Sequence, residues 1–127
     1  MPKVSRESAA NVEDHGPVED RYEEIGDRSI NFVTFRESID GTPLLKGLPD
    51  DRCQCVHEGY VFRGRMTFRF ADHDETYEEG DAFFVPPGHA PLAEAGTEVV
   101  MFSPVEEMRA VSEAMARNAA AMTAGAG

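Results

Sequence analysis

The sequence predicts one all-β domain that ends in an α-helix. From about residue 29 to residue 102, short runs of β-branched and aromatic residues recur about every eight to twelve residues, with Gly, Pro and Asp between them. That spacing is typical of barrels and sandwiches. Beyond residue 103 the apolar residues recur every three or four positions, which indicates a helix. A chain of 127 residues has room for a single hydrophobic core.

The charge balance argues against two classes of partner. The chain has 24 acidic and 12 basic residues, a formal net charge of -12. Such a surface repels phosphate backbones and anionic membranes, so we expect neither nucleic acid nor a membrane as partner. There is no apolar run near the roughly 20 residues that cross a bilayer, and residues 1–7 lack the apolar core of a secretory signal. We therefore expect a cytoplasmic protein.

The chain divides into an arm, a barrel, a helix and a tail. Residues 1–27 are acidic and show no sustained apolar alternation, so we expect a partly disordered arm. Residues 28–103 form the predicted barrel, and its first strand is the β-branched and aromatic run 29–35. Residues 53–62 are interpreted as another strand, and 63–65 as a tight hairpin turn that follows it.

A helix is predicted over residues 104–122, followed by a flexible tail at 123–127. Ser103 suits the N-cap, Pro104 the first helical position, and Glu106 completes a capping box. An apolar stripe, expected to pack on the barrel or on a second subunit, consists of Val105, Met108, Val111, Met115 and Met122.

The two cysteines and a nearby histidine indicate a metal site. In a strand, Cys53, Cys55 and His57 share one face, and thiolate and imidazole suit Zn²⁺, iron or copper. A disulfide between cysteines two residues apart on one strand is disfavoured, which fits a reducing compartment. Because the outer two lie about 13 Å apart along an extended strand, at most two of the three can meet one ion unless the strand bends. His89, after a rigid Pro-Pro-Gly turn, is the distant candidate; a solvated loop histidine is the alternative.

Two blocks of the sequence resemble the motifs of the cupin superfamily. The first is Glu58–Gly64, and the second is Gly80–His89, in which Gly80, Pro86 and Gly88 occupy the positions of the second cupin motif. The resemblance extends over about residues 29–103. It implies a jelly roll of two antiparallel sheets that is often a dimer, so we expect a homodimer.

The chain departs from the usual cupin metal ligands. His57 stands at the position of the family's glutamate, Pro91 stands at that of its late histidine, and His89 comes two residues earlier. The neighbourhood of the family's His-x-His pair holds Asp51, Cys53 and Cys55. The resemblance therefore leaves two possibilities open, a variant site for Zn²⁺ or iron formed by Cys53, Cys55, His57 and His89, or no metal at all.

Two functions remain open at this stage. One is a metal-dependent oxygenase, isomerase or cyclase that binds a small organic ligand in the barrel, with Glu58 or Tyr60 handling protons. The other is a cupin that senses a ligand or a metal without turnover. A fold alone does not select a reaction.

Overall fold

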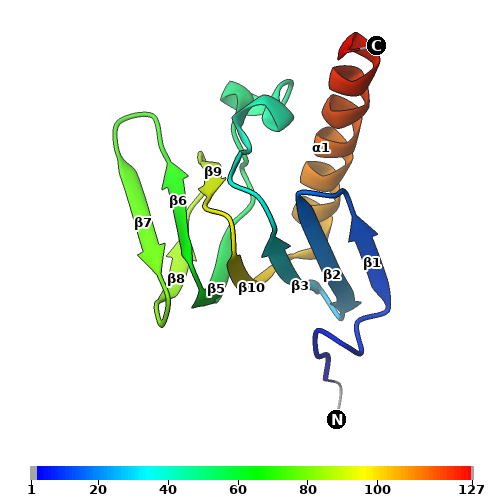
Figure 1. The fold of residues 1–127 in the computed structure, drawn as a ribbon, viewed down its shortest axis with the longest axis vertical. Coiled ribbons are helices and arrows are strands. Elements are labelled where there is room, and N and C mark those ends of the chain that lie inside the picture. Colours follow the sequence, from blue (N-terminus) through cyan, green and yellow to red (C-terminus); the bar gives the residue numbers. More distant parts are fainter. Residues whose placement is uncertain (1–2, 127) are drawn as a thin grey trace.

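The computed structural model describes residues 3–126, which form two antiparallel sheets packed face to face and one long helix (Figure 1). The strand order is β1-β2-β3-β10-β5-β8 in the six-stranded sheet and β4-β9-β6-β7 in the four-stranded sheet. Between β3 and β10 the chain passes repeatedly from one sheet to the other, as in a jelly roll. This confirms the predicted all-β barrel with a C-terminal helix.

The large sheet consists of β1 (Asn11–Asp14), β2 (Val18–Ile25), β3 (Arg28–Phe35), β5 (His57–Arg63), β8 (Ala82–Val85) and β10 (Thr97–Pro104). The small sheet consists of β4 (Ile39–Asp40), β6 (Arg65–Arg69), β7 (Asp74–Glu78) and β9 (Ala90–Ala93). Two 3-10 helices, η1 (Thr42–Leu45) and η2 (Pro49–Asp51), precede β5, and the helix α1 spans Val105–Ala126.

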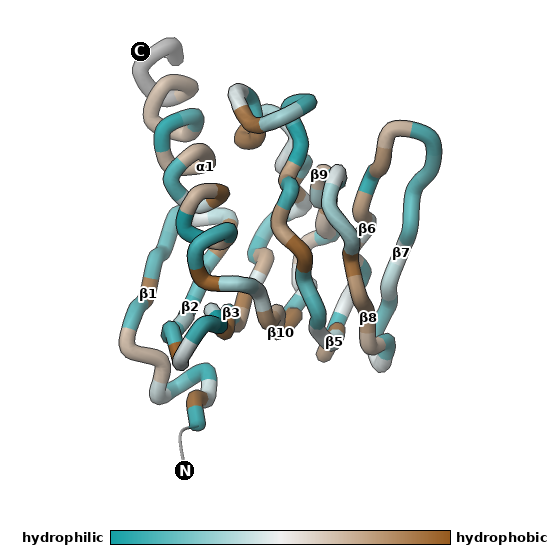
Figure 2. Tube along the Cα trace, turned by 180° about the vertical axis from the view of Figure 1, so that it is seen from behind, coloured by the Kyte–Doolittle hydropathy of each residue, from teal (hydrophilic) through white to brown (hydrophobic). Residues whose placement is uncertain are grey.

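The barrel interior is filled by its own side chains. Hydrophobic segments gather in the barrel strands, whereas β1 and β7 are mostly hydrophilic (Figure 2). Gly59 lies under the ring of Phe83, so closely that a Cβ at Gly59 would come within 2.6 Å of it. The buried residues of this core are Val33, Phe35, Val61, Met66, Phe68, Phe83, Val85, Ala93, Val99 and Met101.

Residues 11–25 form two strands where the sequence predicts a partly disordered arm. β2 pairs with β3 from Val18 opposite Phe35 to Ile25 opposite Arg28. This pairing uses backbone groups, which any sequence supplies, so it leaves little apolar pattern to detect. The expectation of a partly disordered arm is therefore wrong for this stretch.

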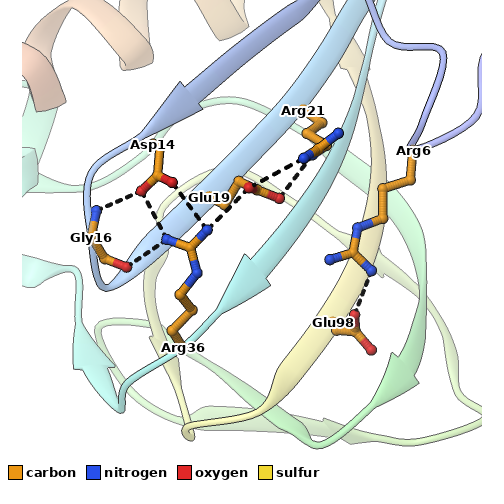
Figure 3. A network of polar contacts seen from close by, with 7 residues as sticks. All are labelled: Arg6, Asp14, Gly16, Glu19, Arg21, Arg36 and Glu98. Carbon is orange, nitrogen blue, oxygen red and sulfur yellow. Dashed lines mark hydrogen bonds and ion pairs between the residues drawn. The ribbon is translucent and has the colours of Figure 1, made fainter.

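Ion pairs hold the acidic N-terminal region against the sheet (Figure 3). The Arg36 guanidinium donates to Asp14 at 2.8 and 3.1 Å and to Glu19 at 3.0 Å. The Arg6 guanidinium donates to Glu98 on β10 at 2.8 Å. The negative charge that suggested a solvated arm thus supplies partners for arginines.

Gly64 marks a corner between the sheets and is not the tip of a hairpin. β5 and β6 belong to different sheets, so the predicted hairpin at residues 63–65 is wrong. Gly64 has φ of +86°, and a Cβ there would lie 2.4 Å from the hydroxyl oxygen of Thr97. That buried hydroxyl accepts from the Arg65 N–H and donates to the Arg65 carbonyl, both at 3.0 Å, which secures the corner.

Helix α1 follows β10, runs beside the large sheet and extends past its strands at the end of the barrel where η1 and η2 lie (Figure 1). Its Val111 is buried in a second apolar cluster with Leu45 and Ala90, and Met108 and Met115 pack against that cluster. This confirms packing on the barrel. The helix continues to Ala126, through most of the predicted tail, and Gly127 lies outside the described residues. Within the described part of the chain, no helix is both long and apolar enough to cross a membrane.

Replacing Asp20 by Asn should stabilise the protein at pH 8. Burial raises the Asp20 pKa to about 6, although the Asn31 side chain donates to both carboxylate oxygens at 3.1 and 3.0 Å. The folded protein then binds this proton more tightly than the unfolded chain, so stability falls as the pH rises from about 4 to about 6. We expect Asp20→Asn to raise the free energy of unfolding at pH 8 by about 1 to 3 kcal/mol and to have little effect at pH 4.

Urea unfolding at both pH values measures this difference, and Asp14→Asn is the matched control. Arg36 holds the pKa of Asp14 at about 2, below its ordinary value, so this carboxylate stabilises the fold at neutral pH. Asp14→Asn should therefore destabilise where Asp20→Asn stabilises. An Asp20→Asn variant that is less stable than the wild type at pH 8 would contradict the burial argument.

Candidate metal centre

Three predicted ligands meet at the helix-covered end of the barrel. The ligand atoms of Cys53, His57 and His89 all lie within 4.8 Å of one another. Their residues are 3%, 5% and 1% exposed. The structure thus brings together one thiol and two imidazoles in a site that is almost closed to solvent.

The approach of Cys53 to His57 depends on a bend that the sequence does not reveal. Residues 53–56 are not a strand, contrary to the prediction for 53–62, and β5 begins only at His57. Cys53 instead forms an isolated bridge with His89, in which its N–H donates to the His89 carbonyl at 2.8 Å. The Cys53 Sγ then lies 3.6 Å from the His57 Nε2.

His89 presents a nitrogen lone pair that has no partner. Its Nδ1 donates to the carbonyl oxygen of Pro86 at 2.8 Å, and because a carbonyl only accepts, the proton is on Nδ1. Burial lowers the pKa of His89, so the ring is neutral and Nε2 is unprotonated. Among the side chains that the structure describes, the His89 Nε2 is the buried nitrogen or oxygen atom that forms no hydrogen bond. The rings of Phe68 and His89 pack edge to face, with centroids 5.1 Å apart.

His57 is oriented by Ser103. The His57 Nδ1 lies 2.7 Å from the Ser103 hydroxyl, and Ser103 is fully buried. With Nδ1 donating to the serine, Nε2 is free to act as a ligand. Burial lowers the His57 pKa to about 3, so the imidazole remains neutral at physiological pH.

Sequence reasoning missed Ser103, because Ser103, Pro104 and Glu106 match a capping box. The structure keeps Ser103 in β10 instead, where the side chains of Val99, Met101 and Ser103 alternate into the barrel. The sequence did contain a sign of this. Positions 99, 101 and 103 lie two residues apart, so in a strand their side chains point to the same, inner face. The predicted N-cap is therefore wrong.

The donor set fits a tetrahedral transition-metal site. Bonds of about 2.0 Å to nitrogen and about 2.3 Å to sulfur place neighbouring ligand atoms about 3.3 to 3.6 Å apart in such a site. The Cys53 to His57 separation of 3.6 Å already matches, and every other pair lies within 4.8 Å. Burial raises the Cys53 pKa to about 11, so the thiol is protonated in the metal-free protein and must lose a proton to bind an ion.

The other predicted site residues are not in this group of three ligands. Cys55 is 1% exposed and belongs, like Cys53, to the apolar cluster under α1, but its thiol donates to the Val56 carbonyl at 3.4 Å. Glu58 and Tyr60 alternate with the inward residues of β5 and are exposed on the opposite face from His57. The structure therefore does not bring Glu58 and Tyr60 to the group formed by Cys53, His57 and His89.

Neither a protein-family model nor a curated protein sequence matches this chain. Several solved structures do match this chain. A protein of unknown function from Rhizobium leguminosarum bv. viciae has 15% sequence identity and a TM-score of 0.60, covering 82% of this chain and 96% of that one. The polyketide cyclase RemF from Streptomyces resistomycificus has 16% identity and a TM-score of 0.59, covering 82% and 79%.

An RmlC-like cupin from Shewanella frigidimarina has 19% identity and a TM-score of 0.51, covering 74% of this chain and 83% of its own. Identities this low bear on the fold alone. In this chain, consecutive strands from β3 to β10 mostly alternate between two antiparallel sheets, as in a jelly roll. This chain has the cupin fold.

Proposed function

We propose that this protein binds one divalent transition-metal ion, Zn²⁺ or iron, through Cys53, His57 and His89. The observation that carries the proposal is the unpartnered Nε2 of His89. Leaving a buried nitrogen without a partner costs about 1 to 3 kcal/mol, and a metal bond at that atom removes the cost. The neighbouring thiol and imidazole provide the further ligands.

The ligand types select the metal. One sulfur and two imidazole nitrogens suit Zn²⁺ and iron and are poor ligands for Mg²⁺ or Ca²⁺. A bound ion of this kind can act as a Lewis acid. Ser103 supports the site by fixing the orientation of His57, and the backbone bridge to Cys53 fixes the position of His89.

A binding or sensory role is favoured over catalysis. The ring of Phe68 packs against that of His89, and Phe68 belongs to the buried core of the barrel with Phe83 and Met66, which fills space that a substrate would need. Glu58 and Tyr60, the two candidates for proton transfer, face away from the cluster. We therefore infer that metal binding itself, with a structural or sensory consequence, is the function of this centre.

One observation favours a second candidate, a metal-dependent enzyme acting on a small organic ligand. The cluster supplies three protein ligands, and a catalytic zinc site typically has three and keeps a position open for water or substrate. The structural neighbour RemF is named as a polyketide cyclase, but at 16% identity it supports only the shared fold.

Metal content should depend on one cysteine and not on the other. Protein purified without chelator should contain about one equivalent of Zn²⁺ or iron by elemental analysis. Cys53→Ser should lose most of this metal, because it removes the sulfur ligand. Cys55→Ser is the matched control, since Cys55 is equally buried and only two residues away, and it should retain the metal. Equal loss in both variants, or no metal in the wild type, would refute the three-ligand assignment.

Removing the Ser103 hydroxyl should weaken metal binding without abolishing it. Outer hydrogen bonds to a ligating histidine typically contribute tenfold to a hundredfold in affinity, so Ser103→Ala should raise the Kd for Zn²⁺ about tenfold to a hundredfold in a chelator competition titration. Ser29→Ala is the control: Ser29 lies opposite Ser103 in the β3–β10 register, but its hydroxyl donates to Asn31. If both variants bind Zn²⁺ like the wild type, Ser103 does not orient His57.

Cobalt substitution separates the binding role from the catalytic one. Co²⁺ in place of the native ion should give the absorption bands of a tetrahedral site with one thiolate. If the function is binding alone, added azide or a small carboxylate should not reach the buried ion. The spectrum should then stay unchanged. A spectrum that shifts and saturates with added anion would show an open coordination position and favour the enzyme.

A further inference from the structure

A cavity of about 270 Å³ lies between helix α1 and the strands β2 and β3 (Figure 1). Hydroxyl, amide and carboxylate groups from all three elements line it. They include those of Tyr22 and Glu24 on β2, Ser29 and Asn31 on β3, and Ser112 on α1. The cavity is thus equipped to bind a small molecule through hydrogen bonds.

Strand β3 changes from apolar to polar where its inner face reaches this cavity. Val33 and Phe35 belong to the barrel core. Ser29 and Asn31, which occupy the other inward positions of β3, are polar, and each is only 2% exposed. Buried polar side chains are normally hydrogen-bonded, so the partners of these two decide what the cavity can bind.

The carboxylate of Asp20 sets the direction of the hydrogen bonds at the floor of the cavity. The Asn31 side-chain nitrogen donates to both Asp20 oxygens, at 3.1 and 3.0 Å, so the Asn31 Oδ1 is left to face Ser29. Because Oδ1 only accepts, the Ser29 hydroxyl donates its one proton to it, at 2.7 Å. Within the described residues, the Ser29 oxygen accepts no hydrogen bond. A ligand that contacts Ser29 must therefore be a donor.

The charges around the cavity favour a cation. Glu24 is neutralised by Arg109, whose guanidinium donates to it at 2.8 and 2.5 Å. Neither Asp20 nor Glu113, which lines the cavity from α1, forms an ion pair with any residue that the structure describes. Two carboxylates are thus left without a positive partner. Tyr22 adds an aromatic ring to the wall, and a cation is also attracted to the face of such a ring.

We propose that this cavity binds a small organic amine as its ammonium ion. An ammonium group has three N–H donors and no acceptor, which matches a floor where the Ser29 oxygen can only accept. The negative charges of Asp20 and Glu113 attract it, whereas they repel a carboxylate or a phosphate. The volume suits a compound of a few heavy atoms. None of the three proposed metal ligands lines the cavity, so this site is separate from the metal centre.

Titration of the metal-loaded full chain with propylamine at pH 8, followed by amide NMR shifts, tests the proposal. At this pH the amine is protonated and Asp20 is ionised, since its pKa is about 6. We expect saturating shifts of the Ser29, Asn31 and Ser112 amides with a Kd of about 1 mM, because so small a ligand makes few contacts. The uncharged 1-propanol should bind at least about tenfold more weakly, and propionate should not bind.

Two variants should weaken this binding and one should not. Asp20→Asn removes a charge and frees the Asn31 amide to turn over, so the propylamine Kd should rise at least about tenfold. We expect this variant to be more stable than the wild type at pH 8, so unfolding cannot explain the loss. Ser29→Ala removes the accepting oxygen and should also raise the Kd at least about tenfold. Asp14→Asn is the matched control: it makes the same change of charge outside the cavity, and its Kd should stay within about threefold of the wild type.

Four outcomes would overturn the proposal. The first is the absence of saturating shifts with propylamine, and the second is propionate binding as tightly as the amine. The third is an Asp20→Asn variant that binds like the wild type, as it would if the amine bound to the metal instead. The fourth is equal weakening in Asp14→Asn, which would assign the effect to the overall charge of the protein and not to the cavity.

Discussion

Strand β5 turns its side chains alternately to the barrel interior and to solvent, and the group formed by Cys53, His57 and His89 depends on this two-residue period. His57, Gly59 and Val61 point inward, where they supply a ligand, the space for Phe83 and a core contact. Glu58 and Tyr60 point outward. Because a shift of one residue in register would exchange the two faces, pairing with β10 and β8 fixes His57 on the inner face.

The backbone bridge between Cys53 and His89 controls the geometry of the cluster. It joins the segment before β5 to the loop after β8, so a thiol and an imidazole that are 36 residues apart along the chain are held side by side. The backbone hydrogen bonds between Cys53 and His89, at 2.8 and 3.2 Å, hold these positions without using either side chain. A preformed site of this kind loses less conformational entropy on binding than one that must fold around its metal.

The sequence predicts the barrel well where side chains alternate or cluster in the core. The run at 29–35 forms β3, whose bounds lie within one residue of the predicted ones. β1 and β2 were missed because backbone pairing and arginine ion pairs hold them, and neither leaves an apolar period. The corner at Gly64 looked like a hairpin because local turn chemistry does not say which sheet the next strand joins.

The candidate site was predicted in its residue types but not in its geometry. His57 and His89 were identified as candidates, yet the expectation for Cys53 assumed an extended strand, in which it would lie too far from His57. The bend at residues 53–56 brings the two together, and it depends on a contact with His89 distant in sequence. Ser103 was assigned to a cap because its local pattern fits one equally well. In each case, a partner far along the chain decided between two locally acceptable structures.

The closed barrel also limits how an ion could reach the cluster. Cys53 belongs to the apolar cluster that Val111 of α1 covers, and the Asn118 amide on α1 donates to the carbonyls of Leu44 and Lys46 at 2.7 and 2.8 Å. These contacts hold the helix against the apolar cluster that contains Cys53. An ion can therefore reach the three ligands only when this end of the barrel opens locally. Exchange would then be slow compared with an open site, which suits an ion that is retained and is poorly suited to substrate turnover.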